Sequence, residues 1–186
     1  MALRKRAATG RPAWLVSALA LVATVTAAAV LTGATAQADS GHRHDDDTLF
    51  EFETLAGVSG VFVGDEEPIR GVNGGGLPWS IEEGEIELES DGTLRVRVEG
   101  LVLADVEGVP PDLRGTNPVT QFRVALSCLT PEGDIAPPVT SDAFPASTDG
   151  DARAKVRLEL PDTCFAPIVF VTSPTLAWFA VSGFER

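Results

Sequence analysis

The strongest constraint on the fold is segment 84–100, GEIELESDGTLRVRVEG, in which apolar and charged residues alternate on both sides of a turn. This period of two is typical of β-strands with one buried face. A three-residue loop at 90–92, with Gly92 in the left-handed conformation, joins the strands in one register that suits both faces. The facing pairs in this register are Ile86–Val96, Leu88–Leu94, Glu85–Arg97 and Glu87–Arg95.

The rest of the chain has the same character from Thr48 onward. Short segments rich in Val, Ile, Phe and Thr alternate with Gly, Pro and Asp clusters, and no segment keeps a helical period for ten residues. We therefore predict an all-β fold, a two-sheet antiparallel β-sandwich of immunoglobulin-like or jelly-roll-like size, with a closed barrel as the alternative. About eight strands are expected, at 48–55, 59–64, 84–90, 93–104, 119–129, 151–160, 166–173 and 175–184.

The apolar patterns predict which strands lie inside. Segments 166–173 and 175–184 are apolar on both faces, so we expect central strands covered on both sides. In segment 151–160 the apolar and charged residues alternate, which predicts one buried face. A ligand site is expected in the long connections at 64–78, 104–118 and 130–144, because loops on a rigid scaffold carry recognition.

The N-terminus has the features of a secretory signal. Four basic residues, at positions 4, 5, 6 and 11, precede an apolar run that ends in the small residues Ala36, Gln37 and Ala38. We predict a signal peptide at 1–38 and a secreted, extracellular protein. The alternative is an uncleaved segment that anchors the chain, since about 20 apolar residues can span a bilayer.

Cleavage there leaves a strongly acidic chain. The predicted signal removes four basic and no acidic residues, so the formal net charge changes from −13 to −17. Such a field repels phosphates, which argues against nucleic acid as a partner, and it favours cations and cationic partners. We expect residues 39–47 to form a disordered acidic tether and 48–186 a single domain.

Cys128 and Cys164 are the two cysteines of the chain. In an exported domain of this size two cysteines most simply form one disulfide. Cys128 shares its parity with Phe122, Val124 and Leu126, so its side chain is expected to point into the core.

The cysteine neighbourhoods NPVTQFRVALSCL and ARAKVRLELPDTCFAPIVFVTS, with AWFAVSGF and LPWSIEEGEIELESDGTLRVRVEGLVL, resemble a family of small exported actinobacterial β proteins with two cysteines and no assigned activity. The resemblance covers most of 77–184. It implies one extracellular β domain with a disulfide, and it carries no catalytic residue across.

Both histidines of the chain lie in the predicted tether. His42, His44 and Asp45 are weak candidates for a metal site, because a free terminus gives ligands little fixed geometry. The predicted domain therefore lacks the usual imidazole base, which argues against an enzyme of the Ser-His-Asp or Cys-His type. No cofactor is expected.

Carboxylates and one tryptophan supply the remaining candidates. Trp79 follows a glycine-rich segment and is a candidate ligand contact, while Trp178, on an apolar strand, is expected in the core. Glu82, Glu83 and Glu85 beside Trp79 would be the acids of a glycan hydrolase. Acidic clusters at 65–67 and 149–151 could hold calcium but match no EF-hand loop.

We therefore expect a secreted, non-enzymatic β-sandwich that acts by surface interaction with an extracellular or envelope partner. A carbohydrate-binding module and a carboxylate-based hydrolase of extracellular glycan are the alternatives. Contact with a membrane is expected only if the signal segment remains attached.

Overall fold

The computed structural model describes residues 47–182, and within them the fold is all-β. Twelve strands and one 3-10 turn occur in this part of the chain. The strands form antiparallel sheets that pack face to face and do not close into a barrel. The predicted sandwich is therefore confirmed. Among the described residues no helix has the length and apolar character needed to cross a membrane.

The first sheet has four strands in the order β1-β4-β5-β10. The alternating segment at 84–100 forms its centre, and all four predicted facing pairs of this hairpin are confirmed. Gly92 has φ 86°, the left-handed conformation that the short loop requires. The strands are β1 (Thr48–Phe52), β4 (Glu83–Glu89), β5 (Thr93–Glu99) and β10 (Ala152–Arg157).

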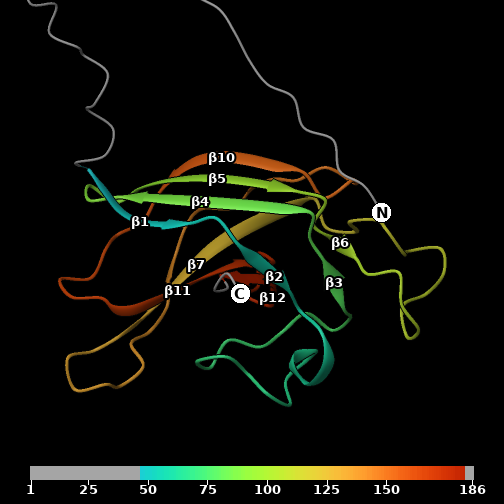
Figure 1. Cartoon of the computed structure of the whole chain (residues 1–186), viewed down its shortest axis with the longest axis horizontal. Coiled ribbons are helices and arrows are strands. Elements are labelled where there is room, and N and C mark those ends of the chain that lie inside the picture. Colours follow the sequence, from blue (N-terminus) through green and yellow to red (C-terminus); the bar gives the residue numbers. More distant parts are fainter. Residues whose placement is uncertain (1–46, 183–186) are drawn as a thin grey trace, which may run out of the picture. The chain divides into compact units, whose positions relative to one another are not determined.

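The second sheet has the order β2-β12-β11-β7-β8, and β9 pairs with β7. Its strands are β2 (Leu55–Gly57), β12 (Trp178–Ser182), β11 (Phe165–Thr172), β7 (Gln121–Leu129), β8 (Val139–Thr140) and β9 (Phe144–Pro145). A third, two-stranded sheet joins β3 (Trp79–Ser80) to β6 (Val102–Leu103). Figure 1 shows the four-stranded sheet as one layer, with β7 and β11 crossing the view beneath it.

The core lies between the two larger sheets and is built from residues of one parity on each strand. Ile86 and Leu88 on β4 and Leu94 and Val98 on β5 are fully buried, whereas the charged residues between them face outward. Phe122 contributes to the same cluster from β7. Burial on one side of the four-stranded sheet thus fixes which of its residues are free to meet another molecule.

The two central strands of the six-stranded sheet, β11 and β12, are covered on both faces, as segments 166–173 and 175–184 predicted. Val169 and Phe170 are adjacent on β11, so they point to opposite faces, and both are completely buried. Segment 59–78 supplies the outer cover: Phe62 contacts the ring of Trp178, and Arg70 Nη1 donates a hydrogen bond to the carbonyl of Ser127 at 3.2 Å. The four-stranded sheet, in contrast, presents a broad face of outward charged side chains.

Two predicted strands differ in the structure. Segment 59–64, SGVFVG, contains a 3-10 turn, η1 (Gly60–Phe62), because Gly60 and Gly64 both have positive φ and interrupt an extended run. Segment 93–104 is divided by Gly100, at φ 64°, into β5 and β6, which belong to different sheets. In both places glycine conformation outweighed the β-propensity of the neighbouring residues.

Candidate functional site

The outer face of the four-stranded sheet concentrates the positive charge of an acidic protein. Residues 47–182 contain 23 acidic and eight basic residues, a formal net charge of −15. Five of the eight basic residues occupy alternating, outward positions on β5 and β10. They are Arg95, Arg97, Arg153, Lys155 and Arg157. The acidic residues of β4 border this basic area on one side.

The pairing of β5 differs between its two neighbours. Across β4 and β5, Glu85 faces Arg97 and Glu87 faces Arg95, which are favourable opposite-charge pairs. Across β5 and β10, Arg97 faces Arg153 and Arg95 faces Lys155. Like charges directly opposite each other destabilise a sheet. Like charges also face each other at Glu51–Glu87 and Glu83–Glu99, so the β5–β10 boundary is distinguished by like-charged pairs that are both cationic.

Carboxylates of the described residues pair with four of these five cations. Arg97 Nη2 and Arg153 Nη2 each approach the same Glu99 oxygen at 2.9 Å, so one carboxylate serves two guanidinium groups. Arg95 Nη1 lies 3.1 Å from Glu87 Oε2 and 2.5 Å from Glu89 Oε1, so it pairs with two carboxylates of β4. Lys155 is exposed and forms no ion pair with any residue in the described part of the chain. The ammonium group of Lys155 therefore remains available on β10, between Arg153 and Arg157.

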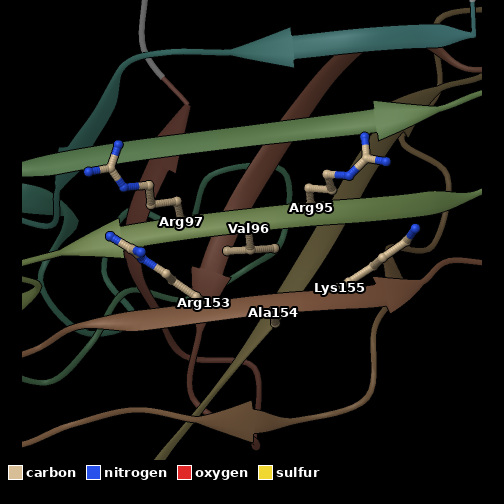
Figure 2. A pocket seen from close by; sticks show the side chains of 6 residues that line it. All are labelled: Arg95, Val96, Arg97, Arg153, Ala154 and Lys155. Atoms are coloured by element: carbon tan, nitrogen blue, oxygen red, sulfur yellow. The ribbon is translucent and has the colours of Figure 1, made fainter. Parts of the chain in front are cut away.

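A shallow, open depression of about 430 Å³ lies between the two rows of cations. Figure 2 shows Arg97 and Arg153 at one end of it and Arg95 and Lys155 at the other, with the strand segments at Val96 and Ala154 between them. We call this depression the basic furrow. Its openness suits an extended ligand that lies on the surface better than a small molecule, which is usually enclosed.

Protection of a sheet edge explains only part of this cluster. β10 is the edge strand of its sheet, and charged side chains on an edge discourage pairing with other chains. That argument applies to the basic residues of β10. It does not apply to Arg95 and Arg97, because β5 is an interior strand with partners on both sides.

Glu99 forms ion pairs with both arginines at one end of the furrow, Arg97 and Arg153. Hydrogen bonds from Arg153 and Arg97 hold the pKa of its carboxyl below the usual value of 4.5. A carboxylate whose pKa is lowered in the folded state stabilises the fold above its unfolded pKa, and this contribution is lost as the pH falls through the folded pKa.

We therefore expect Glu99→Gln to lower the urea midpoint of unfolding at pH 7, and to lower it progressively less as the pH falls through the lowered folded pKa of the wild-type carboxyl. Glu107→Gln, which removes a carboxylate outside the ion-pair network, is the control for net charge. A midpoint difference for Glu99→Gln that is larger at pH 3 than at pH 7 would contradict this role.

The two cysteines form the predicted disulfide. Cys128 at the end of β7 is bonded to Cys164, which precedes β11, and the Cα atoms lie 4.8 Å apart. Cys128 is 2% exposed, so the prediction that it points into the core is also confirmed. The bond joins two neighbouring strands of the six-stranded sheet, opposite the layer that carries the furrow.

The prediction that Trp79 is a ligand contact is wrong. Its side chain is 5% exposed and stacks on Phe179 with ring centroids 4.0 Å apart. The glycine-rich segment before it passes close to these rings: a Cβ on Gly75 would lie 3.0 Å from Trp79 Nε1. The glycines thus allow backbone to cover the ring. Trp178, at 2% exposed, is in the core as predicted.

The predicted metal ligands lie in a different part of the chain from the described residues. His42, His44 and Asp45 lie outside residues 47–182, so the structure says nothing of them. Within those residues, no group of three or more His, Cys, Asp or Glu side chains is arranged to hold a metal ion. The acidic clusters at 65–67 and 149–151 lie within these residues, so neither forms such a group.

The carboxylates proposed for glycan hydrolysis lie in an open setting. Glu82, Glu83 and Glu85 are exposed, and Glu83 Oε1 lies 3.5 Å from Arg97 Nη1. A general acid in a glycosidase needs a desolvated environment that keeps its proton. With Trp79 buried, these residues also lack the sugar platform that the hydrolase hypothesis required.

The furrow itself was not predicted from the sequence. The alternating basic residues of 93–99 and 151–157 were visible as solvated strand faces, but their pairing was not. These strands are about 60 residues apart, and nothing local states that β10 is the neighbour of β5. The repeated pattern of basic, small apolar, basic in RVR and RAK is the one signal that could have suggested it.

Comparison with known proteins gives no relative from which to transfer a function. No protein-family model matches the chain, and neither a curated protein nor a solved structure matches it. The functional argument therefore depends on the geometry of this chain.

Proposed function

We propose that this chain is an exported, non-enzymatic β-sandwich domain that acts by binding a partner outside the cell, and that the outer face of its four-stranded sheet is the recognition surface. The single observation that carries the proposal is the pairing of like charges across β5 and β10 in a protein of net charge −15 over the described residues. Facing cations on one surface of an acidic protein suit an anionic partner, because complementary charges attract and orient it.

Other features agree with export and with binding. A disulfide suits an oxidising compartment, and the N-terminal 38 residues have the composition of a secretory signal. The resemblance of the cysteine segments to small exported actinobacterial proteins is part of the same proposal. Binding is favoured over hydrolysis because Trp79 is buried and Glu82, Glu83 and Glu85 are exposed.

The chain offers a direct test, because Lys155 is the only lysine among residues 47–182. The protein purified from culture fluid would be mixed with envelope fractions, and amine acetylation of the retained protein measured by mass spectrometry. We expect retention, with Lys155 acetylated more slowly in the bound than in the free protein. Carbodiimide labelling of Glu132 and Asp134, exposed in the loop after β7, serves as the control and should be unchanged.

The outcomes separate the two parts of the proposal. Absence of retention by every fraction would contradict the binding function. Retention with Lys155 as reactive as in the free protein would contradict the assignment of the binding face. Lys155→Arg keeps the charge without the reactive amine, and it should be retained as the wild type is.

A further inference from the structure

The basic furrow defines the chemistry of the partner more closely than the proposed function does. Its four cationic residues form two facing pairs, Arg97–Arg153 and Arg95–Lys155, at consecutive outward positions of the two strands. Figure 2 shows the guanidinium groups of Arg95 and Arg97 extending over β4. Outward positions on one strand are about 7 Å apart, since the rise is about 3.3 Å per residue. The Cα atoms of two facing residues lie about 5 Å apart across antiparallel strands.

We propose that the furrow binds an anionic glycopolymer, a polysaccharide or polyol chain that carries a carboxylate, phosphate or sulfate on successive units, with the polymer running parallel to β5 and β10. This inference rests on the proposed binding function and adds the ligand class and the residues that hold it. Arg97 and Arg153 bind one anionic group, and Arg95 with Lys155 binds the next.

The composition of the furrow favours anionic groups of this type. Guanidinium groups donate paired hydrogen bonds in a plane and match the oxygens of carboxylate and phosphate, while the ammonium of Lys155 acts as a point charge. Glu99 holds Arg97 and Arg153 side by side before the ligand arrives, with both nitrogens 2.9 Å from one oxygen. This arrangement reduces the side-chain ordering that binding would otherwise require.

The shape of the site favours a polymer over a free ion. The depression is open along its length and has no enclosing wall that could exclude water from a single small anion. Arg157 continues the row of cations on β10 beyond the furrow, and its ion pair with Asp91 is long, at 3.6 Å between exposed side chains. A ligand with repeated charges can therefore use several weak contacts along one strand.

The charge of the surroundings favours a glycopolymer over a densely charged nucleic acid. Four glutamates of β4, at alternate positions from Glu83 to Glu89, line the border of the basic area. A double helix with a charge every 1.7 Å or so would place phosphates against these carboxylates. A single polymer chain with widely spaced charges fits within the width of the two basic strands.

The test measures binding of the purified exported protein to immobilised polygalacturonate, dextran sulfate and poly(glycerol phosphate), with neutral dextran as the blank. We expect binding to at least one of the anionic polymers and none to dextran, with an affinity that falls steeply as salt is raised. The three polymers distinguish carboxylate, sulfate and phosphate as the preferred group.

The variant Arg153→Gln/Lys155→Gln should weaken this binding by about tenfold or more, a change equal to about 1.4 kcal/mol, and should flatten the salt dependence. Its matched control is Arg70→Gln/Arg114→Gln, which removes two positive charges outside the four-stranded sheet and should bind within about twofold of the wild type. Thermal unfolding of both variants verifies that each is folded.

Equal loss in both double variants would show a response to net charge alone and would overturn the assignment of the furrow. Binding to polyaspartate with no binding to any of the three polymers would also overturn it, in favour of an acidic protein partner. Failure of the ligand class is distinguishable from failure of the proposed function. Envelope fractions that retain the wild type and Arg153→Gln/Lys155→Gln equally would leave a binding protein that uses a different surface.

Discussion

Replacing Cys128 and Cys164 together with alanine should lower the free energy of unfolding by about 4 kcal/mol. The bond closes a loop with a sequence separation of 36 residues, and the chain-entropy relation gives about this loss for such a loop. β10 lies between the two cysteines in the sequence, so it belongs to the loop that the disulfide closes. The disulfide therefore also restricts the chain segment that places β10 beside β5. A small domain has only about 5–15 kcal/mol of stability in total.

Urea unfolding followed by fluorescence and by circular dichroism measures this change. The control is the wild type in reductant. Its free energy of unfolding should equal that of the double variant, apart from the small effect of replacing two cysteine side chains with alanine. If the oxidised wild type and the double variant differ by less than about 1 kcal/mol, the disulfide does not have the stabilising role assigned to it.

Replacing Trp79 with alanine should cost about 3–5 kcal/mol of stability, the range observed when a large aromatic residue is removed from a core. The ring is 5% exposed and stacks on Phe179, with the planes inclined by 21°. β3 also pairs with β6, so the side chain anchors the small two-stranded sheet against β12. The predicted effect is structural and does not involve a ligand.

Phe165→Ala is the matched control, because this aromatic ring is 52% exposed. We expect a loss of about 1 kcal/mol or less for that substitution. Thermal and urea unfolding of both variants test the difference. A Trp79→Ala protein of wild-type stability that failed to bind an anionic polymer would contradict the buried position of the ring and restore its role as a contact.

The sequence predicted those features whose causes are local. The hairpin at 84–100 was placed in register because turn chemistry at Gly92 and alternation on both sides agree. The apolar runs at 166–173 and 175–184 correctly indicated central strands, since only a strand covered on both faces is apolar at every position.

The incorrect predictions concern features decided by distant parts of the chain. Segment 59–64 has strand-forming residues, but Val61 is 63% exposed in the turn. An extended strand there therefore gains no stability from burial of this side chain. Trp79 follows a glycine-rich segment, which suggested exposure on a long loop. Its burial comes from Phe179, which lies 100 positions later in the chain.

The furrow illustrates the same limit at the functional level. Each of its strands has an ordinary amphipathic sequence with a solvated face, and only strand pairing reveals that two basic rows lie next to each other. Electrostatics within one strand is visible in a sequence, whereas electrostatics between strands depends on topology. For this reason the predicted site lay in the loops, and the site that the geometry supports lies on a sheet face.

The most direct test of the account is an NMR titration of the purified protein with the anionic glycopolymer that binds most tightly. Chemical shifts of backbone amides and of the arginine side chains would locate the contact without any substitution. The account predicts that the largest changes occur on β5 and β10, at the amides of residues 95–97 and 153–155. Changes confined to the loops at 64–78 and 130–144, with β5 and β10 unaffected at saturation, would contradict it.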